Sequence, residues 1–193
     1  MSKNRKSRFS LLAVLLCALF ITESIWFSRD TFAAEKGSVL ESRILKTGEK
    51  APIFQGEQLG GGEFDLSQHV GEKPVVIFFW SFFCGPCMEE MPILHRVYED
   101  LGRDSVSFIS INLDGVKLSK AIEKFMENSN LIFTTVFDEL IGLEYKIADA
   151  YGVSGTPTLY LIDPDGKIAL SIVGLVEPEE LKGAIERSMG KTL

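Results

Sequence analysis

Residues 74–87 decide the fold of this chain, and they read PVVIFFWSFFCGPC. The run from Pro74 to Trp80 is continuously apolar, which is typical of a strand buried on both faces of a sheet. Apolar residues then recur at helical spacing over residues 86–101, which predicts a helix. The motif C-G-P-C therefore stands where a buried strand passes into a helix.

The two cysteines of this motif are predicted to be redox-active. Cys84 lies at the expected helix start, where unpaired backbone N–H groups and the helix dipole stabilise a thiolate, so it is the expected attacking sulfur. Cys87 lies one turn further on and is the expected resolving sulfur. Gly85 and Pro86 suit the bend, because proline is tolerated in the first helical turn. A disulfide of this spacing closes almost no loop and adds little stability, so reactivity explains the pair better.

Metal and haem sites are weaker interpretations of the cysteine pair. Zinc requires about four donors, but the chain beyond residue 34 adds only His69 and His95. Covalent haem attachment needs a histidine directly after the second cysteine, and Met88 stands there. The sequence predicts neither a metal nor another cofactor.

The N-terminus is predicted to direct export. Four basic residues precede an apolar run of 13 residues, Phe9 to Ile21, which is broken only by Ser10. This length suits a signal peptide better than a membrane span of about 20 residues. Small residues around Ala33 offer a cleavage site, but the apolar character continues beyond Ile21, so an uncleaved anchor is the competing interpretation.

The rest of the chain is expected to form a single domain. A length of 193 residues with 46% hydrophobic content suffices for one well-buried core. Residues 35–193 hold 15 basic and 25 acidic side chains, a formal charge of −10. A nucleic-acid interface needs a basic face, so this charge argues against one. The expected division is a signal peptide or membrane anchor at 1–34, a linker at 35–47 and the domain at 48–193.

Strands and helices are predicted to alternate along this domain. A hairpin around Gly60–Gly62 is followed by an α/β order that ends in a hairpin, turned at residues 163–166, and a helix that begins at Pro178. This order predicts a central mixed sheet with helices on both faces and an N-terminal β-hairpin extension. Strands are expected at 52–59, 63–66, 74–80, 106–113, 133–137, 158–162 and 167–173, and helices at 86–101, 118–126, 142–151 and 178–189.

These features resemble the thioredoxin superfamily. The resemblance rests on residues 80–87, on Pro92 five residues after the second cysteine, and on the sequence G-T-P-T at residues 155–158. With the export segment, the extra hairpin and the insertion around residues 114–151, the chain is similar to the ResA, TlpA and CcmG group of extracytoplasmic thiol-disulfide oxidoreductases. The resemblance covers roughly residues 48–190 and implies a thioredoxin-like fold.

The resemblance also implies roles for residues outside the C-G-P-C motif. The proline that matches Pro157 is cis in this family and lies beside the cysteines, which would turn Thr156 toward an extended substrate segment. Thioredoxins carry a buried aspartate where this chain has Phe78. ResA-like proteins instead carry a glutamate that Glu90 matches, and a desolvated Glu90 would exchange protons with the thiols. The alternatives are an ordinary strand-entry proline and a solvated carboxylate.

The expected function is the reduction of disulfides in exported proteins. The resemblance implies apocytochrome c or another oxidised exported protein as substrate, and a membrane thiol transporter as electron donor. Two alternatives stay open: a binding or chaperone module with a static disulfide, and a thiol peroxidase, although the peroxiredoxin pattern P-x-x-x-T-x-x-C is not matched before Cys84. The expected catalytic residues are Cys84, Cys87 and Glu90, and the expected substrate-binding residues are Trp80, Phe83, Gly85, Pro86, Thr156 and Pro157.

Overall fold

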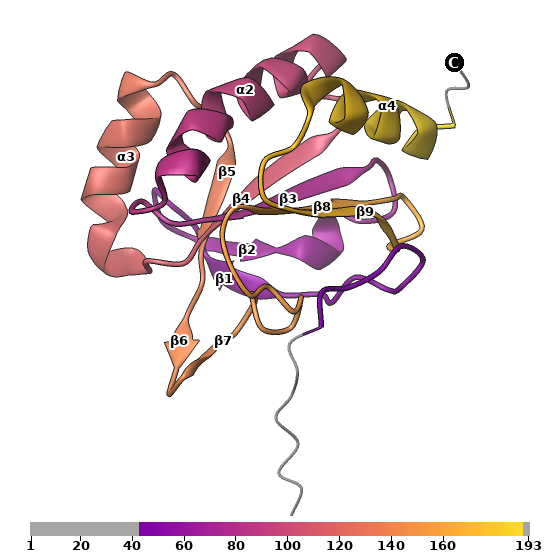
Figure 1. Ribbon diagram of the computed structural model, residues 1–193. Helices are drawn as coiled ribbons and strands as arrows, with labels where there is room; N and C mark the ends of the chain where they lie inside the picture. Colours follow the sequence, from indigo (N-terminus) through magenta and orange to yellow (C-terminus); the bar gives the residue numbers. More distant parts are fainter. Residues whose placement is uncertain (1–42, 191–193) are drawn as a thin grey trace, which may run out of the picture. The chain divides into compact units, whose positions relative to one another are not determined.

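A computed structural model describes residues 43–190, and a five-stranded mixed sheet lies at its centre (Figure 1). The strand order is β5-β4-β3-β8-β9. The first three of these strands are mutually parallel, whereas β8 runs antiparallel to both β3 and β9. The predicted α/β fold class with a central mixed sheet is thereby confirmed. The strands are β3 (Val75–Trp80), β4 (Ser107–Asn112), β5 (Thr134–Phe137), β8 (Thr158–Ile162) and β9 (Ile168–Val173).

The central strand β3 is the apolar run from which the fold was predicted. All of its residues are buried, because neighbouring strands flank it and packed layers cover both faces. Alternate side chains point to opposite faces, which divides the core into two clusters. Phe78 and Trp80 belong to one cluster, and Ile77 and Phe79 belong to the other.

Three α-helices cover the face toward which Phe78 and Trp80 point (Figure 1). Each contributes its buried residues to one cluster, such as Leu94 of α2, Ile122 of α3 and Leu181 of α4. Pro178 stands in the first turn of α4, as predicted. The helices are α2 (Gly85–Leu101), α3 (Ser119–Asn128) and α4 (Pro178–Ser188), and a short 3-10 turn, η2 (Val116–Leu118), precedes α3.

The opposite face is covered by the N-terminal hairpin and by turns. The hairpin consists of β1 (Gln55–Glu57) and β2 (Glu63–Asp65), and the 3-10 helix η1 (Leu66–Gln68) follows it. Gly60, Gly61 and Gly62 all have positive φ in its turn, which glycine adopts without strain. Helices were predicted on both faces, but η1 is the only helix on this face within residues 43–190.

The helix predicted at residues 142–151 is wrong. A small hairpin of β6 (Leu140–Ile141) and β7 (Glu144–Tyr145) stands there, and turns follow it. The backbone N–H groups of Ile147 and Ala148 donate to the buried carboxylate of Asp138, at 2.9 and 2.8 Å. These bonds fix the turns beside β5, and Gly142 with φ 68° lies in the tight turn between β6 and β7.

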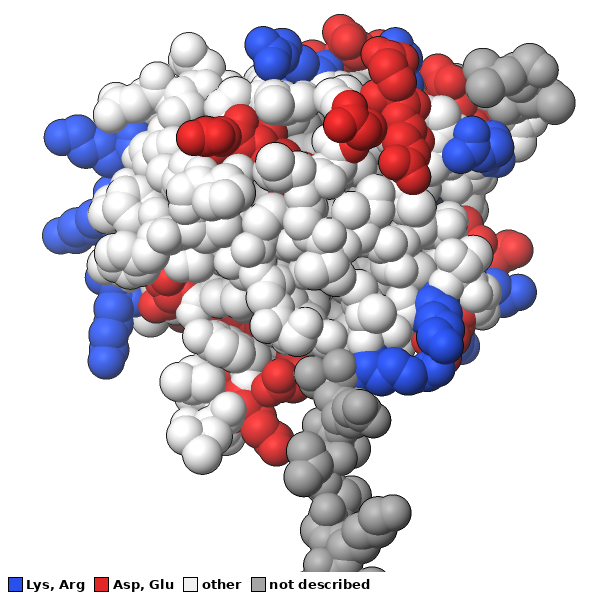
Figure 2. Space-filling view, viewed as in Figure 1, with Lys and Arg blue, Asp and Glu red and all other residues white. Residues whose placement is uncertain are grey.

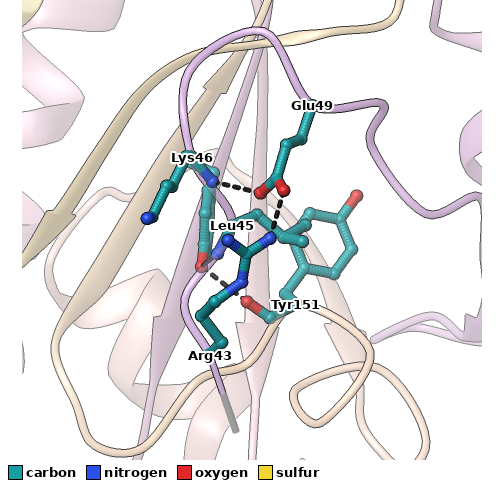
Figure 3. A network of polar contacts seen from close by, with 6 residues as sticks. Arg43, Leu45, Lys46, Glu49 and Tyr151 are labelled. Carbon is teal, nitrogen blue, oxygen red and sulfur yellow. Dashed lines mark hydrogen bonds and ion pairs between the residues drawn. The ribbon is translucent and has the colours of Figure 1, made fainter.

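Residues 43–52 lie against the hairpin-covered side of the sheet (Figure 3). The backbone N–H of Leu45 donates to the hydroxyl of Tyr160 at 3.2 Å, which in turn donates to the carbonyl of Tyr151 at 2.6 Å. Arg43 pairs with Glu49. Residues 43–47, which belong to the predicted linker 35–47, therefore include residues that contact the domain.

The predicted signal peptide or anchor, residues 1–34, lies outside the described residues, as do residues 35–42 of the linker and residues 191–193. Between residues 43 and 190, no helix has the length and apolar character needed to cross a membrane.

Candidate active site

The cysteine pair lies at the start of α2. Cys84 is the N-cap residue with an extended backbone, and a disulfide joins it to Cys87. The backbone N–H of Cys87 donates to the Sγ of Cys84 at 3.2 Å. Cys84 is half-buried, whereas Cys87 is completely buried in the helix-covered core. The sulfur that accepts a backbone N–H is therefore the more accessible one, as an attacking and a resolving cysteine require.

The segment between β3 and Cys84 is held by Asp114. Its carboxylate accepts hydrogen bonds from the Ser81 hydroxyl at 2.7 Å and from the Phe82 backbone N–H at 2.6 Å. Asn112 donates to the same carboxylate at 2.9 Å. The Ser81 carbonyl accepts from the Cys84 N–H at 3.0 Å. Asp114 thus fixes the backbone that presents Cys84.

This role of Asp114 was not identified from the sequence, although the sequence contained a signal for it. Asn112 and Asp114 stand at the carboxyl end of β4, and Ser81 directly follows β3. The two strands are parallel neighbours, so their carboxyl ends share one edge of the sheet. Polar residues that follow adjacent strands are expected to meet at that edge.

Glu90 is buried on the same side of α2 as Cys87. Its side chain is 2% exposed, whereas that of Glu89 is exposed, so the solvated alternative does not describe it. Oε1 accepts the backbone N–H of Val176 at 2.7 Å, and Oε2 has no partner within residues 43–190. Burial raises the pKa of Glu90, and the Val176 N–H offsets only part of this rise.

Pro157 lies at the same end of the sheet and is preceded by a cis peptide bond. Thr158 pairs with Phe79, so the register sets Pro157 beside the end of β3 from which the cysteine segment begins. Pro157 is buried and Thr156 is half-buried. Within residues 43–190, the backbone N–H and C=O of Thr156 have no hydrogen-bond partner. They are free to pair with an extended peptide.

The aromatic residues of the motif differ in exposure. Trp80 is completely buried, and its ring lies 6.1 Å from that of Phe125. Phe83 is 78% exposed beside the cysteines, and Gly85 and Pro86 are exposed as well. In this disulfide form Phe83, Gly85 and Pro86 are accessible to a substrate, but Trp80 is not.

Histidines and carboxylates do not gather into a further centre in the described part of the chain. Between residues 43 and 190, no group of three or more His, Cys, Asp or Glu side chains is placed to hold a metal ion. His69 stacks on Phe64, and His95 packs edge-on against Phe133. Both histidines therefore serve in packing.

Comparisons with known proteins agree with this geometry. The model of the AhpC/TSA family matches residues 47–171. The thiol-disulfide oxidoreductase ResA of Geobacillus thermodenitrificans is 34% identical over 146 residues, which cover 76% of this chain and 80% of ResA.

Solved structures give the same result. A structure described as a thiol:disulfide interchange protein DsbE of Chlorobium tepidum is 30% identical with a TM-score of 0.65, and the match covers 76% of this chain and 99% of that one. A secreted disulfide oxidoreductase of Mycobacterium tuberculosis is 26% identical with a TM-score of 0.58, covering 69% of this chain and 95% of that one. The chain therefore belongs to the AhpC/TSA family and, within the thioredoxin superfamily, to the ResA-like thiol-disulfide oxidoreductases.

Proposed function

We propose that this chain reduces disulfides in proteins outside the cytoplasm through Cys84 and Cys87. The observation that carries the proposal is the asymmetry of the pair at the start of α2. Cys84 is accessible and its sulfur accepts the N–H of Cys87, while Cys87 is buried. In the reduced enzyme the same N–H and the helix dipole would stabilise a Cys84 thiolate.

The reaction transfers two electrons from the cysteine pair to the substrate. The Cys84 thiolate attacks one sulfur of the substrate disulfide, so that bond breaks, a mixed disulfide forms and the leaving thiolate takes up a proton. Cys87 then loses its proton and attacks the Sγ of Cys84. The second substrate thiolate leaves, takes up a proton, and the Cys84–Cys87 disulfide remains.

Glu90 is the group that we propose accepts the proton of Cys87. It lies one helical turn beyond Cys87 on the buried side of α2. Its Oε2 has no partner within residues 43–190, so it retains a lone pair for a proton. Burial raises its pKa, which brings the carboxyl closer to the pH range in which thiols exchange protons. Phe78, which replaces the aspartate of thioredoxins, has no proton to exchange.

Substrate contacts are proposed for the surface around Cys84. The free backbone groups of Thr156 would pair with the extended segment that carries the substrate disulfide. Phe83 would contact its apolar side chains, together with Gly85 and Pro86. Trp80 would act by packing beneath the cysteine segment, and Pro157 would keep an N–H donor away from the sulfurs.

The proposal extends to where the enzyme acts, which proteins it reduces and which donor supplies its electrons. The predicted export segment and the description of one similar structure as secreted support a site of action outside the cytoplasm. We propose oxidised exported proteins such as apocytochrome c as substrates, and a membrane thiol transporter as the source of electrons that restores the dithiol.

The test is a trapping experiment combined with kinetics. A reduced Cys87→Ser variant should accumulate mixed disulfides with substrate through Cys84, whereas Cys84→Ser should form none. The wild type should reduce a disulfide-containing peptide faster than it consumes hydrogen peroxide. Preferential peroxide consumption would establish the peroxidase alternative, and a native disulfide inert to dithiol reductants would establish the static module.

A further inference from the structure

The β6–β7 hairpin exposes apolar side chains at a position that packing does not explain. Leu140, Ile141 and Leu143 are 56%, 60% and 98% exposed. The hairpin projects from the body of the domain in Figure 1, and its tip is uncharged in Figure 2. Several adjacent exposed apolar residues on a projection are typical of an interaction site, unlike apolar residues scattered singly.

A cavity connects this hairpin with the neighbourhood of Cys84. Its volume is about 890 Å³, and it lies between the β1–β2 hairpin, the segment after β4 and the base of the β6–β7 hairpin. Leu140 and Tyr145 line one side, Val116 lines another, and Phe83 lines the side next to the cysteines. The apolar hairpin is therefore continuous with the surface that carries Phe83.

The rim of this cavity is acidic. Glu57, Glu63 and Glu139 line it and are exposed, and none of them forms an ion pair within residues 43–190. Glu144 lies on the hairpin itself. Two lysines, Lys117 and Lys146, oppose these carboxylates. The remaining negative charge favours a partner that brings basic side chains and disfavours an anionic lipid surface.

The base of the hairpin is held in place. The Asp138 carboxylate accepts the backbone N–H groups of Glu139, Ile147 and Ala148, so it joins the two ends of the hairpin. The Tyr145 N–H donates to Asp149 at 2.6 Å. The Tyr145 carbonyl accepts the Asp149 N–H at 3.3 Å, so the outer side of β7 is occupied. In the described chain, β6 pairs with no strand other than β7, which leaves the outer edge of β6 open. A fixed hairpin with one open edge and apolar side chains is suited to an extended peptide.

We propose that the β6–β7 hairpin and the acidic cavity beside it bind an extended segment of the partner protein that is rich in apolar and basic side chains. This inference rests on the proposed function, because the bound segment would extend from the disulfide presented to Cys84. Leu140, Ile141 and Leu143 would cover its apolar side chains, and Glu57, Glu63 and Glu139 would pair with its basic ones. The hairpin thus selects the substrates of this enzyme.

The experiment uses the full chain and two synthetic peptides. Both peptides contain the same small disulfide ring, and they carry either a Leu-Lys arm or a Leu-Glu arm. Wild type should reduce the Leu-Lys peptide faster. The double variant Leu140→Ser/Leu143→Ser should show about a tenfold lower kcat/KM for that peptide, because apolar side chains of the arm are then no longer buried against the hairpin. The loss should appear as a higher KM. Reduction of the small disulfide 5,5′-dithiobis(2-nitrobenzoate) should stay unchanged.

Two further variants sharpen the result. Glu57→Gln/Glu63→Gln should reduce the preference for the Leu-Lys peptide about threefold or more, and this loss should shrink at high salt. Ile132→Ser is the matched control, because Ile132 is also exposed but lines a different hollow. An equal loss in Ile132→Ser, or equal rates for the two arms in wild type, would overturn the proposal.

A binding measurement separates this inference from the proposed function. A fluorescent Leu-Lys arm without cysteines should bind the wild type, and its Kd should rise about tenfold in Leu140→Ser/Leu143→Ser. That result would support the docking surface even if the chain reduced no disulfide. Absence of arm binding while the small disulfide is reduced would refute the docking surface alone. Binding to phosphatidylglycerol vesicles that is lost in the same double variant would also overturn it, by making the hairpin a membrane contact.

Discussion

Glu90 and Asp138 are two buried carboxylates in different surroundings, and the contrast separates a chemical role from a structural one. Their side chains are 2% and 3% exposed, and burial raises the pKa of both. Asp138 accepts three backbone N–H groups, and both of its oxygens are used. Glu90 accepts one, and its Oε2 has no partner within residues 43–190.

The difference in hydrogen bonding indicates what each carboxylate stabilises. The bonds to Asp138 satisfy backbone donors that a buried turn would otherwise leave unpaired, which is a structural requirement. The free oxygen of Glu90 is costly in the folded protein and brings no structural gain. Such a cost is common where a group takes part in proton transfer, so incomplete hydrogen bonding next to Cys87 supports the proposed role.

The largest expected effect comes from removing the carboxylate of Asp138. Asp138→Ala leaves three backbone N–H groups without their acceptor, so the free energy of unfolding should fall by about 3 kcal/mol. Urea denaturation of the oxidised protein measures this change. Glu139→Gln is the matched control, because it alters an exposed neighbouring carboxylate and should change stability by less than about 0.5 kcal/mol. A similar loss in both variants would remove the contrast between Asp138 and Glu90.

The next effect concerns the rate of disulfide exchange. Glu90→Gln keeps the shape of the side chain but cannot accept the proton of Cys87, so the resolving step near pH 7 should slow by roughly 10²-fold. Wild-type rates should rise with pH as Glu90 ionises, and the variant should lack this rise. Stopped-flow mixing of the reduced enzyme with a peptide disulfide resolves the two steps.

Glu89→Gln provides the control for that experiment. Glu89 is the exposed neighbour on the same helix, so its variant should retain the wild-type pH profile. Initial attack by Cys84 should remain unchanged in both variants. If Glu90→Gln retained the rise of rate with pH, Glu90 would be only a buried structural carboxyl.

A smaller effect is expected on stability, and its sign follows from the raised pKa of Glu90. Between the ordinary value of 4.5 and the raised folded-state value, the folded protein binds more protons than the unfolded chain. Wild-type stability therefore falls as the pH rises through this window. Glu90→Gln escapes this loss and should be more stable than the wild type at pH 7, with no gain below pH 4.5. Denaturation of the oxidised proteins at several pH values measures the difference.

Local periodicity in the sequence predicts some secondary-structure elements correctly and others not. The apolar run at residues 74–80 and the helical spacing after Cys84 depend on local periodicity, and the structure confirms both. The segment at residues 142–151 has helical spacing too, but the backbone N–H groups of Ile147 and Ala148 donate to the Asp138 carboxylate, nine and ten residues earlier. A side-chain acceptor of this kind leaves no trace in the apolar periodicity from which the helix was predicted.

Some features of the candidate site were also predictable from local spacing, whereas others depend on residues that are distant in sequence. The spacing of Cys84, Cys87 and Glu90 along one helix made their shared position predictable. Whether Glu90 is buried depends on Val176, which follows β9 and is far away in sequence. The support of Asp114 for the cysteine segment required the pairing of β3 with β4, which a single sequence does not specify in register.

Asp114 is intermediate between the two buried carboxylates, Asp138 and Glu90. The smallest expected effect, on the alkylation rate of Cys84, comes from weakening its contacts. Like Asp138 it organises backbone, but that backbone belongs to the segment that presents Cys84. Ser81→Ala removes the hydroxyl that donates to Asp114 and accepts the Phe83 N–H at 3.1 Å, two bonds worth about 1 kcal/mol each. The variant therefore frees the segment in the reduced enzyme, where no disulfide restrains it. Alkylation of Cys84 at pH 7 should slow about threefold, because its sulfur meets the Cys87 N–H less often. Ser105→Ala, in a turn after α2, should leave alkylation unchanged, and an equal rate in all three proteins would limit Asp114 to the stability of the fold.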